Sequence, residues 1–141
     1  MSVRSFIDTN ILVYPDVADD PTKQAIALRL LGEHMRGGTG VISTQVLHEY
    51  VNVALRKLAL PVELIRSRLA LYSRLELVAA SPAAVGAALD VHVLHKVSFY
   101  DALIVQAARQ SGCVQLLTED MNSGAVIAGV RLVNPFAVLA G

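Results

Sequence analysis

The chain has 141 residues, a formal net charge of zero, 54% hydrophobic and 17% charged residues, and a mean hydropathy of +0.51. This length predicts one domain, residues 1–141, that can bury a core without disulfides or a structural metal. Zero net charge argues against a protein that coats nucleic acid, and no stretch approaches the roughly 18 uninterrupted apolar residues of a membrane helix. The apolar surplus suggests a buried subunit or partner interface, although an over-filled core would also explain it.

Short apolar runs alternate along the chain with longer stretches of helical periodicity. Asp20 before Pro21 and the pair Gly37-Gly38 are typical of a helix start and a helix end. In chain order we expect a strand at 3–7, a helix at about 21–36, a strand at 41–42, helices at about 44–58 and 61–74, a strand at 77–78, helices at about 82–96 and 99–111, and strands at 114–117 and 130–133. Strands that alternate with helices indicate an α/β sandwich with a mainly parallel central sheet.

Acidic residues follow two of the predicted strands. Asp8 comes directly after the first strand, and Glu119 and Asp120 follow the strand at 114–117 after one residue. Ligands of parallel sheets collect outside the carboxyl ends of the strands, so Asp8 and Asp120 are expected at the same edge. Taken alone, each acid also fits an ordinary polar turn, because an Asp side chain can bond its own backbone.

Two further acids stand on predicted helices. Asp101 lies in the first turn of a nearly all-apolar helix, three residues after the capping residue Ser98. A capping box and the helix dipole both favour a carboxylate there, as a metal site also would. Glu49 lies opposite the apolar stripe of its helix, and periodicity alone makes it a solvated residue. That stripe consists of Leu47, Tyr50, Val51, Ala54, Leu55 and Leu58.

Considered together, these four carboxylates predict a cation site. Converging carboxylates without a cation repel one another, and some are forced to protonate. Carboxylates accompanied by Asn, Ser and Thr, without a Cys/His cluster, favour Mg²⁺ or Mn²⁺ over Zn²⁺. Sites of this kind bind a phosphate and lower the pKa of an attacking water. The acids therefore favour hydrolysis of phosphodiesters.

The basic residues leave two interpretations open. A mildly basic middle of the chain is either a solvated helix face or a contact surface for phosphate. Its members are Arg56, Lys57, Arg66, Arg68 and Arg74. The single cysteine, Cys113, reads as a buried strand thiol in a reducing compartment, which favours the cytoplasm.

Four segments of the chain, in order and at matching spacing, resemble the motifs of PIN domains. Residues 8–14 (DTNILVY) resemble the opening motif, and residues 43–50 (STQVLHEY) resemble the second motif, which carries a glutamate. Residues 98–108 (SFYDALIVQAA) and 116–121 (LLTEDM) resemble the third and fourth. The resemblance covers the whole chain, and four motifs in order are far more specific than one Asp-Thr-Asn.

The resemblance implies a PIN-like α/β/α sandwich and points to VapC-type toxins of prokaryotic toxin–antitoxin pairs. Such proteins are Mg²⁺- or Mn²⁺-dependent RNA endonucleases, usually homodimers, and a cognate antitoxin holds them inactive. Carried over by position, Asp8 and Asp101 would be the main metal ligands, and Glu49 and Asp120 would complete the acidic cluster. Supporting polar groups would come from Thr9, Asn10 and Ser98.

Two other functions remain as alternatives. An aspartate-based phosphatase would use Asp8 as a nucleophile, but phosphatases of the haloacid dehalogenase type need a second aspartate where this chain has Asn10. A degenerate PIN-like module would bind a partner without catalysis, and the intact set of acids argues against it.

Overall fold

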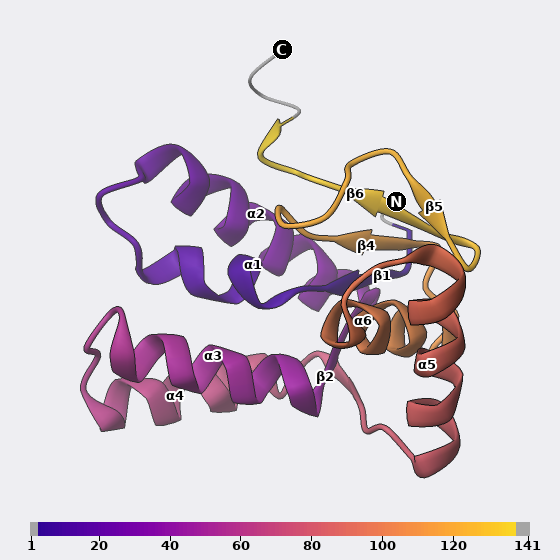
Figure 1. Cartoon of the computed structure of the whole chain (residues 1–141). Helices are drawn as coiled ribbons and strands as arrows, with labels where there is room; N and C mark the ends of the chain where they lie inside the picture. Colours follow the sequence, from indigo (N-terminus) through magenta and orange to yellow (C-terminus); the bar gives the residue numbers. More distant parts are fainter. Residues whose placement is uncertain (1–2, 138–141) are drawn as a thin grey trace.

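A six-stranded sheet with the strand order β3-β2-β1-β4-β6-β5 forms the centre of the computed structural model, which describes residues 3–137 (Figure 1). The strands are β1 (Ser5–Ile7), β2 (Gly40–Ser43), β3 (Glu76–Val78), β4 (Gln115–Leu117), β5 (Val126–Ile127) and β6 (Val130–Val133). All neighbouring strands pair in parallel, except that β5 runs antiparallel to β6. This confirms the α/β fold class with a mainly parallel sheet.

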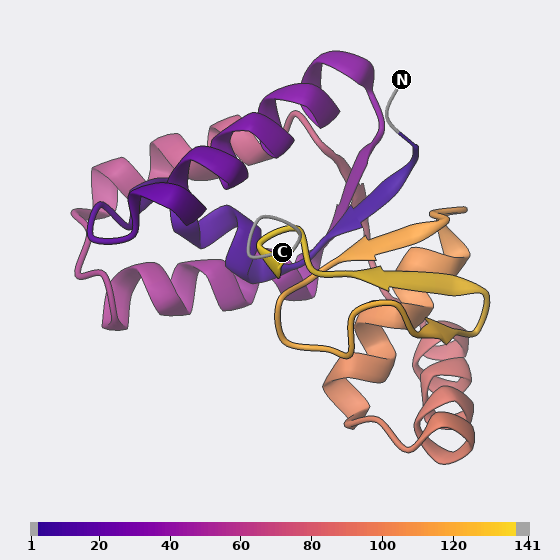
Figure 2. The same cartoon turned by 90° about the horizontal axis from the view of Figure 1, so that it is seen from above.

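Six α-helices and one 3-10 helix connect the strands. They are α1 (Thr9–Val13), η1 (Tyr14–Asp16), α2 (Pro21–Gly37), α3 (Thr44–Arg56), α4 (Val62–Tyr72), α5 (Pro82–His95) and α6 (Phe99–Gln110). Figures 1 and 2 show α5 packed beside α6 at one end of the molecule, with α3 beside α4 at the other. Helix α6 contacts four strands, and α2 and α3 contact β2. No helix in residues 3–137 is both long and apolar enough to cross a membrane.

Local capping signals explain where most of the helices begin and end. The Asp20 side chain accepts a hydrogen bond from the backbone N–H of Lys23, and Gly38, which has a positive φ of 65°, caps the C-terminal end of α2. Ser43 and Ser98 accept from the third residue beyond them and so cap α3 and α6. The predicted elements are therefore present, with bounds that shift by one to a few residues.

Three elements lie outside the prediction, and one predicted helix face was wrong. Helices α1 and η1 and strand β5 are short and carry no periodic pattern. On α3, Leu55 was expected in the core but is 48% exposed, whereas Val46 is fully buried. The buried face of α3 differs from the predicted one because α3 packs against α1 and β2 as well as α4.

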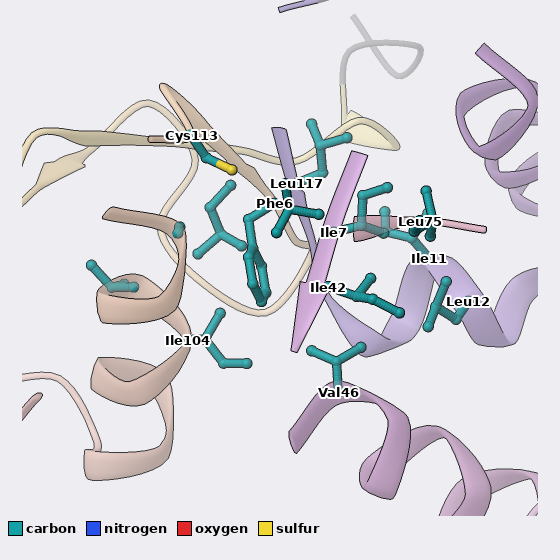
Figure 3. Close-up of a cluster of buried hydrophobic side chains, with 14 of the residues drawn as sticks. Phe6, Ile7, Ile11, Leu12, Ile42, Val46, Leu75, Ile104, Cys113 and Leu117 are labelled. Carbon is teal, nitrogen blue, oxygen red and sulfur yellow. The ribbon is translucent and has the colours of Figure 1, made fainter. Parts of the chain in front are cut away.

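The core surrounds the middle strands of the sheet, as Figure 3 shows. All three residues of β1 are fully buried, because helices cover the central strands and leave neither face of β1 in water. Cys113 is buried at the edge of this core, and burial raises the pKa of its thiol. The buried position agrees with the predicted structural role of this cysteine.

Candidate active site

Asp8 stands at the carboxyl end of β1 and caps α1. One carboxylate oxygen, Oδ1, accepts a hydrogen bond of 2.7 Å from the backbone N–H of Thr9. The other, Oδ2, accepts one of 2.7 Å from the hydroxyl of Thr118, which follows the neighbouring strand β4. Asp8 is only 9% exposed, so both oxygens are held in fixed directions at the edge of the sheet.

The Asp8 carboxyl lies in an environment that disfavours its charge. Burial raises its pKa from 3.8 to about 6, although the hydrogen bonds from Thr118 and Thr9 oppose the rise. Repulsion from the carboxylates of Glu49 and Asp120 raises the pKa further. The proximity of Asp120 to Asp8 agrees with the topology, whereas Glu49 was not expected there from the topology. A cation placed among the three carboxylates would relieve the repulsion.

Glu49 faces α1 and is not a freely solvated side chain. Its Oε2 atom accepts a hydrogen bond of 2.8 Å from the Thr9 hydroxyl, and its Oε1 atom accepts one of 3.0 Å from the Gln45 side chain. The partial burial of Glu49 arises because α1 packs over this face of α3. The solvated position that periodicity indicated is therefore wrong, and Glu49 joins the edge of the sheet that carries Asp8.

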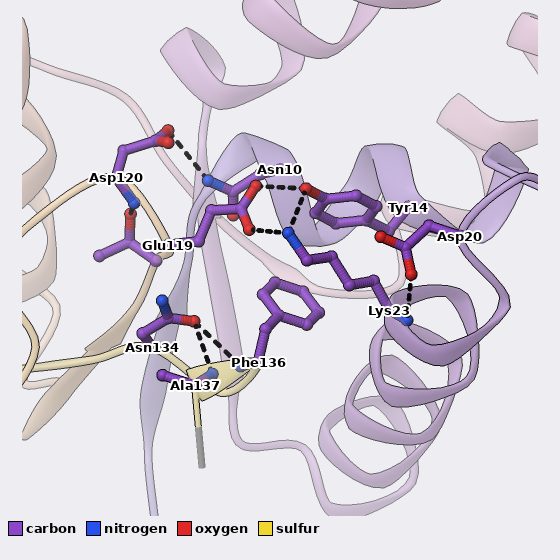
Figure 4. Close-up of polar contacts among 10 residues, drawn as sticks. Asn10, Tyr14, Asp20, Lys23, Glu119, Asp120, Asn134, Phe136 and Ala137 are labelled. Atoms are coloured by element: carbon purple, nitrogen blue, oxygen red, sulfur yellow. Dashed lines mark hydrogen bonds and ion pairs between the residues drawn. The ribbon is translucent and has the colours of Figure 1, made fainter. Parts of the chain in front are cut away.

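Asp120 is held by Asn10, the third residue of the opening segment. The Asn10 side-chain nitrogen donates a hydrogen bond of 3.0 Å to Asp120 Oδ2, which Figure 4 shows. The backbone N–H of Asp120 donates to the Thr118 hydroxyl at 3.2 Å. The Asn10 Oδ1 atom is buried and has no hydrogen-bond partner within the described part of the chain. An unpaired buried amide oxygen is costly, so this atom is suited to a ligand that accepts its lone pair.

Two hollows meet at Asp120. The first, the Glu49 hollow, has a volume of about 410 Å³ and is lined by Thr9, Asn10, Glu49, Asn52, Lys57 and Asp120 among others. The second, the Asp101 hollow, has a volume of about 540 Å³ and is lined by His95, Lys96, Ser98, Asp101, Asp120 and Asn122 among others. Asp120 thus connects the acids on the two sides.

Asp101 is linked to the other acids only through the Asp101 hollow. It lies in the first turn of α6, and its backbone N–H donates a hydrogen bond of 3.1 Å to the Ser98 hydroxyl, as half of the expected capping box. Among the hydrogen bonds of residues 3–137, none joins Asp101 to Asp8 or to Glu49. The structure therefore links Asp8 to Glu49 through Thr9 and to Asp120 through Thr118, whereas Asp101 lies across the second hollow.

The donor set fits a hard divalent cation by its chemistry. In residues 3–137 no three His, Cys, Asp or Glu side chains already stand in a metal-binding arrangement. The residues that line the two hollows nevertheless include the carboxylates of Glu49, Asp101 and Asp120 and the hydroxyls of Thr9 and Ser98, and the unpaired Oδ1 atom belongs to Asn10 of the first hollow. Mg²⁺ and Mn²⁺ prefer such oxygen ligands, and Mg²⁺ commonly keeps several waters and takes only one or two carboxylates.

Sequence reasoning missed the two groups that support this site. The Thr118 hydroxyl donates to the Asp8 carboxylate and accepts from the backbone N–H of Asp120. In the sequence, the position of Thr118 between β4 and the two acids after it is the feature that could have indicated this role. Glu119 forms an ion pair of 2.9 Å with Lys23 and accepts a hydrogen bond from the Tyr14 hydroxyl (Figure 4). The Lys23 ammonium also lies 5.6 Å from the centre of the Phe136 ring. The ion pair of Glu119 with Lys23 connects the loop after β4 to α2.

Comparison with known proteins gives one family and several similar structures. A family model described as PIN domain matches residues 5–125. The sarcin–ricin loop cleaving toxin VapC20 of Mycobacterium tuberculosis is 21% identical, with a TM-score of 0.71, over 90% of this chain and 98% of that one. A toxin–antitoxin complex from Klebsiella pneumoniae is 24% identical, with a TM-score of 0.65, over 93% and 97%. VapBC2 of Rickettsia felis, bound to a DNA fragment from its promoter, is 22% identical, with a TM-score of 0.64, over 92% and 97%. No curated protein matches the chain by sequence.

Proposed function

Because the chain belongs to the PIN domain family, whose model matches residues 5–125, we propose that it is a metal-dependent endoribonuclease and the toxin of a VapC-type toxin–antitoxin pair. The observation that carries this proposal is the group of oxygen donors at the carboxyl edge of the sheet. The carboxylates of Glu49 and Asp120 repel that of Asp8 there, and Asn10, which donates to Asp120, has an unpaired buried Oδ1 atom. A cation satisfies all of these groups at once.

The residues that would hold Mg²⁺ or Mn²⁺ are Asp8, Asp120 and Asp101, with Glu49 completing the acidic cluster. Such a cation supplies positive charge for the phosphate and lowers the pKa of water. Thr9 and Thr118 fix the Asp8 carboxylate by donating one hydrogen bond to each oxygen. Their role is to keep this side chain in one rotamer, which a metal site requires of its ligands.

The reaction that this site would perform is in-line hydrolysis. Water would attack the phosphorus, and the bond to the 3′ oxygen would break. A carboxylate of the site would accept the proton of the water, and the departing 3′ oxygen would take up a proton from solvent. The products carry a 5′-phosphate and a 3′-hydroxyl. Asn10 and Ser98 position the acids, because Asn10 donates to the Asp120 carboxylate and the Ser98 hydroxyl orders the first turn that carries Asp101.

The expected partners are a cognate antitoxin and a second copy of the chain. Three of the compared structures are a VapC toxin or toxin–antitoxin assemblies, which supports an antitoxin partner. Helix α5 exposes Leu89, Val93 and Leu94, which are 51%, 74% and 75% accessible. Such an apolar helix face at the surface supports a protein–protein interface. The proposed toxin acts in the cytoplasm, where its RNA substrates are made.

Cleavage of RNA by matched variants tests the proposal. The wild-type protein with Mn²⁺ should cleave a mixture of single-stranded and hairpin RNAs, whereas Asp8→Asn and excess EDTA should each abolish cleavage. Asp90→Asn is the matched control, because Asp90 is an exposed carboxylate on α5 outside both hollows. Full cleavage by Asp8→Asn would contradict the proposal.

A binding module without catalysis is the second candidate, and the absence of a ready-made group of three acidic ligands within residues 3–137 favours it. Calorimetric titration with Mn²⁺ separates the two functions, because only the enzyme requires a bound cation. The aspartate-based phosphatase has less support. A phosphatase of the haloacid dehalogenase type needs a second aspartate two residues after Asp8, and this chain has Asn10 there.

A further inference from the structure

Two lysines line the hollows on either side of Asp120 without being neutralised. Lys57 lines the Glu49 hollow and Lys96 lines the Asp101 hollow, and both side chains are exposed. Neither lysine belongs to any ion pair found among residues 3–137. Their ammonium groups are therefore available to an anion that enters the hollows.

Other cations near acids are already occupied. Lys23 pairs with Glu119, and Arg68 forms two hydrogen bonds of 2.8 and 2.7 Å with Asp16. Lys23 contacts the loop after β4, and Arg68 contacts the turn after α1. Carboxylates of these segments already neutralise both positive charges. Lys57 and Lys96 differ because each stands in a hollow with carboxylates but pairs with none of them.

Helix capping accounts for part of this arrangement. Both lysines follow the last turn of a helix, where a positive charge interacts favourably with the dipole. Lys96, however, has the left-handed backbone angles φ 56° and ψ 37°, which glycine adopts at lower cost. Ala59 and Ala128 have similar positive φ angles, so this backbone does not by itself indicate a function. It does mean that glycine at position 96 would remove the ammonium group without straining the backbone.

An RNA substrate would give both ammonium groups a partner. An RNA backbone that reaches this edge of the sheet meets four carboxylates, and the chain as a whole has no net positive charge to attract it. Lysine ammonium groups that neutralise individual phosphates are a general source of affinity for RNA. One lysine in each hollow, with Asp120 shared between them, would compensate for the repulsion on both sides of the cluster.

We propose that Lys57 and Lys96 contact the RNA phosphates on the two sides of the cleaved bond, so that the strand crosses Asp120 from one hollow to the other. This inference rests on the proposed ribonuclease function. It assigns substrate-binding residues outside the acidic cluster, and it sets the path of the RNA along the two hollows.

The salt dependence of cleavage measures these contacts. The substrate is a labelled single-stranded oligoribonucleotide that the wild type cleaves with Mn²⁺, and kcat/KM is measured from about 50 to 300 mM KCl. Each of Lys57→Gln and Lys96→Gln should reduce the slope of log kcat/KM against log salt by about 0.7, the contribution of one phosphate contact on a single strand. KM should rise several-fold while kcat changes little, and the double variant should lose both contributions.

Two further variants separate charge from structure. Arg29→Gln removes an exposed cation of α2 that lies outside both hollows and should leave the slope unchanged. Lys96→Gly relieves the left-handed backbone and should raise Tm by roughly 2–4 °C, yet lose the same slope as Lys96→Gln. A gain in stability with a loss of RNA affinity cannot come from damage to the fold.

The outcomes distinguish this inference from the function on which it rests. If the wild type with Mn²⁺ cleaves no RNA, the proposed function fails. If the wild type cleaves and Asp8→Asn does not, but the lysine variants keep the wild-type slope or lose no more than Arg29→Gln, the function stands and the proposed RNA path is overturned.

Discussion

Replacing Asp8 with asparagine should stabilise the metal-free protein. Asn retains an oxygen that can accept from the Thr9 backbone N–H, and its amide nitrogen can donate to the Thr118 hydroxyl, which reverses the bond that this hydroxyl donates to Asp8. The substitution removes a buried charge and its repulsion with Glu49 and Asp120. The variant therefore loses an unfavourable interaction while the surrounding structure is retained.

The pH dependence gives the magnitude of this effect. The pKa of Asp8 is about 6 in the folded protein against 3.8 for the unperturbed group, so the folded state becomes less stable as pH rises from about 4 to above 6. Two pKa units correspond to about 3 kcal/mol near pH 7.5, and the same relation leaves about 1 kcal/mol near pH 4.5. The hydrogen bonds of the introduced asparagine will not fully match those of Asp8. The free energy of unfolding of Asp8→Asn should therefore exceed that of the wild type by about 1–3 kcal/mol near neutral pH.

Urea unfolding in EDTA at about pH 4.5 and 7.5 measures this change for the wild type, Asp8→Asn and the exposed control Asp90→Asn. The advantage of Asp8→Asn over the wild type should grow by about 2 kcal/mol between the two pH values, whereas Asp90→Asn should follow the wild type. An advantage that is absent near pH 7.5, or equal at both pH values, would refute the account of a strained carboxylate at this position.

Two other substitutions test the packing and the donor set. Gly40→Ala should destabilise the protein by about 1–3 kcal/mol in urea unfolding, because a Cβ atom there would lie 2.6 Å from Leu75 Cδ2 and 3.0 Å from His34 Cβ. An unchanged unfolding midpoint would show that β2 has more room than the structure gives it. Asn10→Ala should weaken Mn²⁺ binding in calorimetry by roughly 10–100-fold, because it removes the unpaired oxygen and the donor to Asp120. An Mn²⁺ affinity equal to that of the wild type would show that Asn10 takes no part in the metal site.

The sequence predicts those parts of the fold that depend on local signals. Asp20 with Pro21, Ser43 and Ser98 are recognisable helix caps, and each caps the helix that was expected. Helix α1 is only five residues long, and its cap Asp8 has the same local pattern as a polar turn. No periodicity can develop over such a segment, so the element appears only once the rest of the molecule packs around it.

The residues of the candidate site likewise include some whose position the sequence predicts and some whose position it does not. Topology places Asp8 and Asp120 at one edge because β1 and β4 are parallel neighbours, and the structure agrees. Periodicity failed for Glu49, since a helix pattern reports a solvated face and cannot reveal that α1 covers it. The unpaired Asn10 oxygen depends on the burial of one atom, which no spacing of residues encodes.

Cleavage of RNA by protein first stripped of metal tests the central claim most directly. Purified protein is freed of cations with EDTA, mixed with a labelled RNA, and then supplied with Mn²⁺. We predict no cleavage before the addition, and afterwards fragments with 5′-phosphate and 3′-hydroxyl ends from the wild type but not from Asp8→Asn. Full cleavage in excess EDTA, or equal cleavage by Asp8→Asn, would contradict the assignment of the acidic edge as a metal-dependent ribonuclease site.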